Sequence, residues 1–345
     1  MILTRPSDQD QTVHVGHGQF RYEVHQRWEQ LPAGWSFVEV AGVATDSADR
    51  VYVFSRSAHP VIVFDRDGKF LTSWGEGLFA RPHGICIGPG DVVYCTDDLD
   101  QTVRKFTPDG KLLLTLGTSG RASDTGVIGH DFRTIKRIGP PFNLPTNLAL
   151  APGGELYVAD GYGNARIHKF SADGRLLFSW GEPGSGAGQF HLPHGIAVDR
   201  QGTVYVADRE NSRIQLFSPG GDFIAEWTDV ARPCQVYVNA RDAVYVAELG
   251  FRAAMWPGTS APTPDATGGR VSIFDRAGKL QARWGSGDNP CAPGDFLAPH
   301  DICVDSRGDV YVGEVVMSGG GKQGLVPPDC HALQKFVSKG GLTPF

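Results

Sequence analysis

The sequence predicts an all-β fold, a six-bladed β-propeller, and three observations support this prediction. One unit recurs six times along the 345-residue chain. Each unit holds short alternating apolar runs separated by Gly/Asp turns, the pattern of four strands joined by hairpins. The last unit lacks its fourth strand, and a matching run stands at the other end of the chain. A two-sheet sandwich would not require that displaced copy.

The clearest copy of the unit covers residues 193–227: a Pro-His-Gly start, a Val-Tyr-Val strand ending in an acid, an aromatic-ended strand and a final Trp. One domain is predicted over residues 1–345. Its blades are expected at residues 36–75, 82–117, 145–181, 193–227, 233–285 and 299–336. Residues 21–28, with Trp28 at the Trp position, would complete the last blade and leave no open edge between the ends of the ring.

Composition excludes several classes of protein. Hydrophobic residues make up 41% of the chain, too many for a disordered segment, and the net charge is -6. This acidity argues against nucleic acid or an anionic membrane as the partner, so a small-molecule partner is expected. No apolar run approaches the ~20 residues of a membrane span. Residues 1–11 lack an apolar signal core, so the predicted location is cytoplasmic.

The six cysteines show no metal-site spacing. Cys86, Cys95 and Cys303 fall in strand-like runs, which indicates buried, reduced thiols. Cys291 and Cys330 lie in long loops, where they could pair, but the sequence favours unpaired thiols.

The long insertions of the chain all fall on one predicted face. They are the connections between second and third strands, or between one blade and the next, at residues 117–145, 249–269 and 315–330. The turns expected on the opposite face are short. Long loops gathered at one end of a rigid scaffold usually shape a binding site.

Histidine recurs at one repeat position on that face. The residue at the start of each inner strand reads, from blade 1 to blade 6, Ala41, His83, Thr146, His194, Cys234 and His300. The histidines occupy alternate blades, so their side chains should converge on the channel roughly 120° apart. Three imidazoles with a fourth position open match a catalytic zinc site. The alternative is a repeat signature in which each His bonds only to backbone.

Other side chains are expected at the same face. Most second strands end in an acid, which we interpret as architecture. Blade 1 has Ser55 there, followed by an unpaired Arg56 suited to a carboxylate substrate. Tyr162, near metal and arginine, would have a lowered pKa and could serve as a base. Asp301 follows His300 and could support an imidazole or bind a hard cation.

Two segments carry a family resemblance. Residues 158–170 (VADGYGNARIHKF) and 206–217 (VADRENSRIQLF) are NHL-repeat sequences. A Leu-Pro-His motif ends at His194, and a Pro-His-Asp motif covers residues 299–301. With these motifs, the chain resembles the peptidyl-α-hydroxyglycine α-amidating lyase family across all six repeats. That family is a six-bladed propeller with a three-histidine zinc site and a structural calcium ion in the channel.

The resemblance implies roles for particular residues. Its zinc ligands fall on His83, His194 and His300; its calcium ligands on Asp301 and the main-chain carbonyls of Val43 and Ile85; its catalytic residues on Tyr162 and Arg56. Two positions differ from the family pattern. Ala298 replaces a Met, which should enlarge or reshape the pocket beside the metal, and Gly163 replaces a Cys.

The expected function is that of a zinc-dependent lyase that cleaves the C–N bond of an α-hydroxy-amide or a related small molecule. One alternative is a metal-dependent hydrolase of an ester, lactone or amide. Another is a non-enzymatic platform for protein binding, for which Phe251, Met255 and Trp256 offer an apolar patch.

Overall fold

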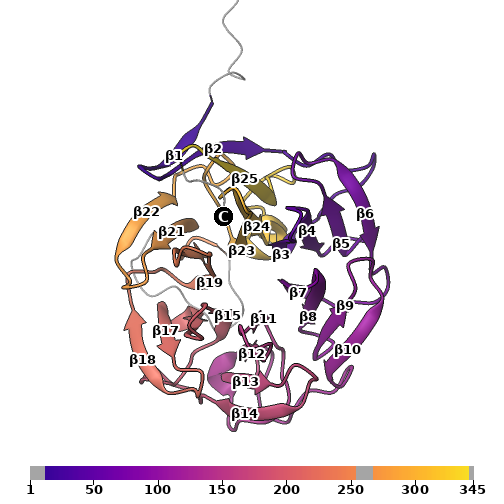
Figure 1. Cartoon of the computed structure of the whole chain (residues 1–345), viewed down its shortest axis with the longest axis vertical. Helices are drawn as coiled ribbons and strands as arrows, with labels where there is room; N and C mark the ends of the chain where they lie inside the picture. The colour runs from indigo at the N-terminus through magenta and orange to yellow at the C-terminus, as the bar shows by residue number, and fades with distance from the viewer. Residues whose placement is uncertain (1–11, 254–266, 342–345) are drawn as a thin grey trace, which may run out of the picture.

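Six antiparallel sheets surround a central channel in the computed structural model, which describes residues 12–253 and 267–341. The sheets are arranged as the blades of a propeller, with one inner strand of each beside the channel (Figure 1). The prediction of an all-β, six-bladed propeller is confirmed. Met255 and Trp256 of the suggested apolar patch lie outside the described residues.

Blades 1 to 5 each contain four strands that run outward from the channel in chain order. Blade 1 comprises β3 (Val40–Thr45), β4 (Val51–Ser55), β5 (Val61–Phe64) and β6 (Phe70–Trp74). Blade 2 comprises β7 (Pro82–Gly88), β8 (Val92–Asp97), β9 (Thr102–Phe106) and β10 (Leu112–Gly117). Blade 3 comprises β11 (Asn147–Leu150), β12 (Leu156–Asp160), β13 (Arg166–Phe170) and β14 (Leu176–Trp180). Blade 4 comprises β15 (Pro193–Val198), β16 (Val204–Asp208), β17 (Arg213–Phe217) and β18 (Phe223–Trp227). Blade 5 comprises β19 (Pro233–Val238), β20 (Val244–Glu248), β21 (Arg270–Phe274) and β22 (Leu280–Gly285).

Blade 6 joins the two ends of the chain. Its strands are β23 (Pro299–Val304), β24 (Val310–Glu314), β25 (Leu333–Ser338), β2 (Phe20–Gln26) and β1 (His14–His17). The N-terminal strand β2 pairs antiparallel with β25, with Val24 opposite Phe336. Closure by strand exchange is therefore confirmed. The outermost strand β1 was not predicted, because the segment His14–His17 lacks apolar alternation.

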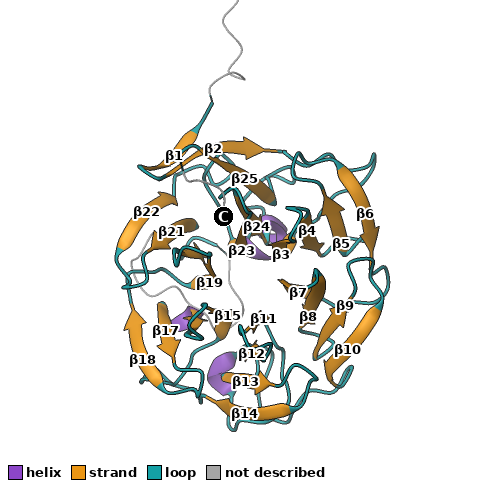
Figure 2. Ribbon diagram, in the orientation of Figure 1, coloured by secondary structure: helices purple, strands orange, loops and turns teal. Residues whose placement is uncertain are grey.

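Little of the chain is helical (Figure 2). The described residues include one short helix, α1 (Val316–Gly319), within the blade 6 insertion. The 3-10 turns are η1 (Phe132–Thr134), η2 (Arg209–Asn211) and η3 (Gly321–Gln323).

The recurring Trp makes the same packing contact between successive blades. Each outer-strand Trp packs against the third-strand Phe of the following blade, as Trp227 does on Phe274 with ring centroids 5.8 Å apart. Trp28 makes the same contact across the closure, 5.7 Å from Phe64 of blade 1. The displaced Trp therefore occupies the structural position that the repeat assigns to it.

Trp28→Ala is expected to weaken this closure. The ring packs on Phe64 and Tyr311, and its indole N–H donates to the carbonyl of Arg66 at 2.9 Å. Removing a large aromatic contact costs about 3 kcal/mol of unfolding free energy. Urea unfolding followed by fluorescence measures the loss, and a change below about 1 kcal/mol would contradict this account of closure.

Candidate metal centre

Three histidines converge at the starts of inner strands β7, β15 and β23. The ligand atoms of His83, His194 and His300 lie within 4.8 Å of one another, and all three side chains are buried. Their ring centroids are 4.8, 4.8 and 4.7 Å apart, which is nearly an equilateral triangle. The repeat position thus brings the predicted ligands together, while the metal itself stays a prediction.

One hydrogen bond fixes the orientation of each imidazole. Every Nδ1 donates to a main-chain carbonyl of the next blade, and that carbonyl belongs to the residue at the same repeat position. The acceptors are Thr146 for His83 (2.6 Å), Cys234 for His194 (2.8 Å) and Ala41 for His300 (2.7 Å). Because a carbonyl can only accept, the proton is on Nδ1, and each Nε2 presents a lone pair. Each histidine thus bonds to the backbone through Nδ1, as the repeat-signature alternative requires, and still has Nε2 available for a metal ion.

The imidazoles are also held neutral. Burial is the main cause of the lowered pKa values of all three histidines. The pKa values of His83 and His194 lie well below the usual value, and the pKa of His300 is about 3. Neighbouring imidazoles and the Arg56 and Arg209 guanidinium groups act in the same direction. Three neutral, nitrogen-donor ligands on one site are the donor set of a catalytic zinc ion.

Tyr162 supplies a hydroxyl to this cluster. Its oxygen lies 3.1 Å from Nε2 of both His83 and His194. A hydroxyl has one hydrogen to donate, so it can satisfy only one of these two lone pairs. The three Nε2 atoms therefore fit a cation better than they fit this hydroxyl alone.

Two glycines let Tyr162 reach the cluster. A Cβ on Gly161 would meet the carbonyl oxygen of Pro193 at 2.0 Å, and one on Gly163 would meet Oδ1 of Asn143 at 2.3 Å. The missing Cys at residue 163 thus has a steric reason. Burial raises the pKa of Tyr162, although the guanidinium groups of Arg209 and Arg81 oppose the shift. The lowered pKa of Tyr162, which the sequence leads us to expect beside a metal ion, stays a prediction.

Arg56 is paired, contrary to expectation. Its Nη1 donates to Glu39 Oε1 at 2.8 Å, and the two side chains are mostly buried. The repeat pattern did not point to Glu39, because Glu39 precedes strand β3 and lies outside the repeat positions that were compared between blades. Arg56 and Ser318 outweigh burial and keep the pKa of Glu39 below its usual value, so the pair is ionised.

The sequence analysis assigned no role to a second arginine, Arg209. Arg209 is 2% exposed, and its guanidinium lies 5.5 Å from the centre of the Tyr162 ring. Nε donates to Glu210 at 2.9 Å, whereas Nη2 is buried and has no hydrogen-bond partner among the described residues. The signal was present in the sequence, since Arg209 follows the acid Asp208 as Arg56 follows Ser55.

A third arginine completes the surroundings of the tyrosine. Arg81 lies 5.9 Å from the centre of the Tyr162 ring and donates two hydrogen bonds to Asp98, at 2.7 and 2.5 Å. Arg56, Arg81 and Arg209 each pair with a carboxylate, and Nη2 of Arg209 is the buried guanidinium nitrogen with donors left for an anion.

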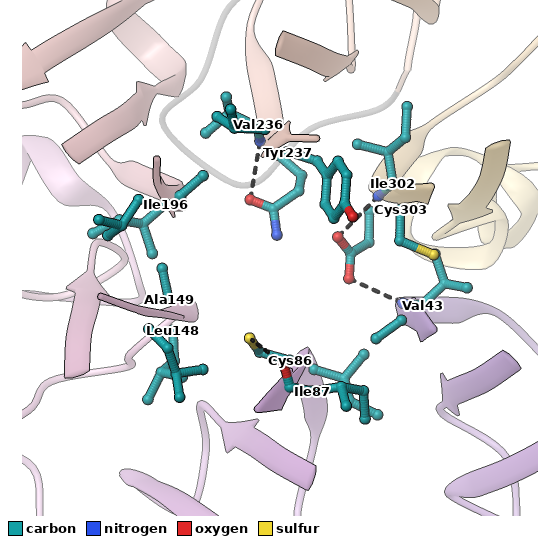
Figure 3. Close-up of a pocket in the computed structure, with 18 of the residues that line it drawn as sticks. Val43, Cys86, Ile87, Leu148, Ala149, Ile196, Val236, Tyr237, Ile302 and Cys303 are labelled. Atoms are coloured by element: carbon teal, nitrogen blue, oxygen red, sulfur yellow. Dashed lines mark hydrogen bonds between the residues drawn. The ribbon is translucent and has the colours of Figure 1, made fainter. Parts of the chain in front are cut away.

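The predicted calcium residues lie deeper in the channel. Asp301, Val43 and Ile85 line one cavity of about 230 Å³, bounded by inner strands of all six blades (Figure 3). The Asp301 carboxylate accepts from the main-chain N–H of Val43 at 3.0 Å and of Ile302 at 2.9 Å. Burial nevertheless raises the pKa of Asp301 to about 7. A buried carboxylate of this kind fits a hard cation, and the calcium assignment stays a prediction.

The Met-to-Ala difference lies next to helix α1. Ala298 is fully buried, and a Cβ placed on Gly319 would meet Ala298 Cβ at 2.4 Å. Helix α1 of the blade 6 insertion therefore fills the space that a longer side chain would need. The expectation that Ala298 enlarges or reshapes the pocket stays a prediction.

Ala298→Met is expected to destabilise the protein. The longer side chain would displace Gly319, and overpacking of this kind costs about 1–3 kcal/mol of unfolding free energy. Thermal unfolding with and without added zinc measures the effect. A variant as stable as the parent would show that α1 yields without cost.

Cys291 and Cys330 form a disulfide, so the expectation of unpaired thiols is wrong. The bond ties the crossover before blade 6 to the insertion that carries α1. The cytoplasmic location stays a prediction. Among the described residues, no helix has the length and apolar character that a membrane span requires.

The fold and the histidine cluster define a class: a β-propeller whose channel carries a candidate metal centre. A model of the NHL repeat matches residues 142–170 and 190–217. NHL repeat-containing protein 3 of Homo sapiens is 33% identical over 319 residues, spanning 88% of this chain and 80% of that protein. The chain belongs to the NHL-repeat family.

Its relatives include named lyases. Peptidyl-alpha-hydroxyglycine alpha-amidating lyase 1 of Drosophila melanogaster is 30% identical over 269 residues, which cover 72% of this chain but 45% of that protein. Among solved structures, a streptogramin B lyase superposes with a TM-score of 0.60 at 14% identity, covering 94% of this chain and all of the other. That structural likeness shows the fold alone.

Proposed function

We propose that the protein is a zinc-dependent lyase that cleaves the C–N bond of an α-hydroxy-amide bearing a carboxylate. The observation that carries the proposal is the cluster of three buried, neutral histidines with Nε2 lone pairs on one site. The relatives named as amidating lyases support the reaction class. Their names concern peptidyl substrates, whereas the proposal for this chain is limited to the carbinolamide group.

His83, His194 and His300 would hold the zinc ion through Nε2. Zinc bound there would supply Lewis-acid stabilisation of the negative charge that develops on the substrate hydroxyl oxygen. The calcium ion, held by Asp301 and the carbonyls of Val43 and Ile85, would be structural.

The reaction splits N–CH(OH)–COOH into an amide and glyoxylate without net uptake of water. The hydroxyl proton must leave as the C–N bond breaks, and the departing nitrogen must gain one proton. Tyr162 is the candidate for this transfer, because its hydroxyl already lies within hydrogen-bond distance of two ligand nitrogens. The same proton can pass from the hydroxyl through Tyr162 to the nitrogen, so charge and atoms balance.

Arg209 is the best candidate to bind the substrate carboxylate. Its Nη2 is buried without a partner among the described residues, and an anion would satisfy it. Arg56, neutralised in part by Glu39, would contribute less to binding and more to orientation. The sequence-based expectation gave Arg56 the role of holding the carboxylate or of keeping Tyr162 ionised.

Two measurements on the purified protein test the proposal. Elemental analysis should find about one zinc per chain. Incubation with an N-acyl-α-hydroxyglycine should release glyoxylate and the primary amide in equal amounts. Absence of zinc, or the absence of glyoxylate with zinc present, would overturn the assignment.

A metal-dependent hydrolase remains the second candidate, because three histidine ligands with an open position also suit the activation of water. Reaction in ¹⁸O-labelled water separates the two. A hydrolase incorporates the label during bond cleavage, whereas the lyase reaction forms its carbonyl from the substrate's own hydroxyl oxygen. Early time points are needed, since aldehydes exchange oxygen with water.

A further inference from the structure

Two nitrogens of the Arg56 guanidinium group donate hydrogen bonds to neighbouring segments. Nε donates to the carbonyl of Pro82 at 2.9 Å, and Nη1 donates to Glu39 Oε1 at 2.8 Å and to Ser318 Oγ at 3.3 Å. Nε and Nη1 thus make all the hydrogen bonds of this guanidinium group to the described residues, and Nη2 makes none.

Glu39 is the centre of this arrangement. It is 3% exposed, and both of its carboxylate oxygens accept hydrogen bonds. Oε1 accepts from Arg56 and from the Ser318 hydroxyl at 2.8 Å, and Oε2 accepts from the Ser318 main-chain N–H at 2.7 Å. A buried carboxylate with this many donors has a single orientation.

The contacts connect two histidine-bearing blades through blade 1. Pro82 directly precedes His83 in blade 2. Ser318 lies in α1 of blade 6, and the adjacent Gly319 packs against Ala298, two residues before His300. The side chains of Glu39 and Arg56 thus span the interval between the segments that deliver two of the three imidazoles.

We propose that Glu39, supported by Ser318, is a positioning residue that orients the Arg56 guanidinium beside the histidine cluster and partly neutralises it. The inference rests on the proposed function for its kinetic consequence. Its structural basis is the set of contacts that join Glu39, Arg56 and Ser318.

The arrangement has an electrostatic cost for binding and a geometric benefit for turnover. A carboxylate next to Arg56 weakens the attraction of that arginine for a second carboxylate, that of the substrate. The same carboxylate prevents the long Arg side chain from changing rotamer, which favours a reactive geometry. Removing the charge should therefore tighten binding and slow the reaction.

Glu39→Gln tests this opposition, because the amide keeps the shape and loses the charge. Binding of an N-acylglycine, the analogue without the hydroxyl, is measured by calorimetry on the zinc-loaded protein. We expect its Kd to fall about tenfold, since one charged hydrogen bond or ion pair is of that magnitude. With an N-acyl-α-hydroxyglycine, KM should fall and kcat should fall about tenfold. Ser318→Ala removes one hydrogen bond of Glu39 and keeps its charge, so kcat should fall by a smaller factor and Kd should stay close to that of the parent.

Asp309→Asn is the matched control. It breaks a buried ion pair of similar geometry, Arg66 Nη2 to Asp309 Oδ2 at 2.7 Å, at the start of β24 and so on the opposite face. Its Kd and kcat should equal those of the parent, even if its thermal stability is lower. The control separates positioning from a general loss of stability.

The results that would overturn the inference are an unchanged or higher Kd in Glu39→Gln, or loss of zinc from that variant. If Glu39→Gln fails to fold, Ser318→Ala decides through kcat, and a kcat equal to that of the parent would overturn the positioning role. The binding measurement does not require turnover. A parent protein that binds N-acylglycine but releases no glyoxylate would therefore refute the proposed reaction and still test the role of Glu39.

Discussion

Purified His194→Ala is expected to retain less than a tenth of the zinc bound by the parent, and its lyase activity should fall by at least about a thousandfold. Two imidazoles cannot hold the ion against loss to solvent as three do. The Ala side chain also leaves the carbonyl of Cys234 without its Nδ1–H donor. Elemental analysis and glyoxylate release after buffer exchange measure both quantities.

His59→Ala is the control for this experiment. His59 stacks on Trp35 with ring centroids 3.3 Å apart, contacts Glu76 and is not part of the histidine cluster. Zinc content and turnover should be those of the parent. Full metal and full activity in His194→Ala would refute the metal centre altogether, whichever reaction the protein catalyses.

Tyr162→Phe is expected to lower kcat about 10²–10⁴-fold, the range usual for loss of a proton-transfer group. The ring would remain between Arg81 and Arg209, so the packing of the site should survive. Only the hydroxyl that contacts His83 and His194 is lost. Because the carboxylate contact to Arg209 is retained, KM should change little.

Tyr245→Phe provides a matched comparison. Tyr245 is equally buried and its hydroxyl lies 3.4 Å from that of Tyr22, in the blade 5–blade 6 core rather than the channel site. Its kinetic constants should equal those of the parent. Zinc content is measured for both variants, and retention of full activity by Tyr162→Phe would remove Tyr162 from the mechanism.

The ring and its closure followed from repetition. Six copies of one strand pattern have one plausible arrangement, and Trp28 marks the displaced strand by its residue type and place. The strand His14–His17 could not be predicted in the same way. It is stabilised by pairing with β2 and carries no internal pattern of its own.

The histidine cluster was predictable for the same reason, since equivalent repeat positions are related by rotation about the channel. Side chains outside the repeat register were not. Glu39 precedes the inner strand, and its contact with Ser318 depends on the path of an insertion 279 residues away. The disulfide between Cys291 and Cys330 likewise depends on how two loops approach each other.

Arg209 shows a different limit. Its position next to the acid Asp208 was visible in the sequence. The sequence pattern could not distinguish an arginine whose nitrogens all make hydrogen bonds from one with a nitrogen that makes none. That distinction depends on where Glu210 and the Tyr162 ring lie in the fold. The proposed role of Arg209 depends on an unmet hydrogen-bonding capacity, which has no signature in residue type.

The joining of β2 to β25 has a consequence for how the protein is made. During translation β2 emerges before the strands of the other five blades, and its partner, Leu333–Ser338, is synthesised after them. A nascent chain can pair β2 with β1, but the edge of β2 that faces β25 must stay open while five other blades are made. The ring can therefore close only after Leu333–Ser338 has been synthesised, however early the individual blades fold.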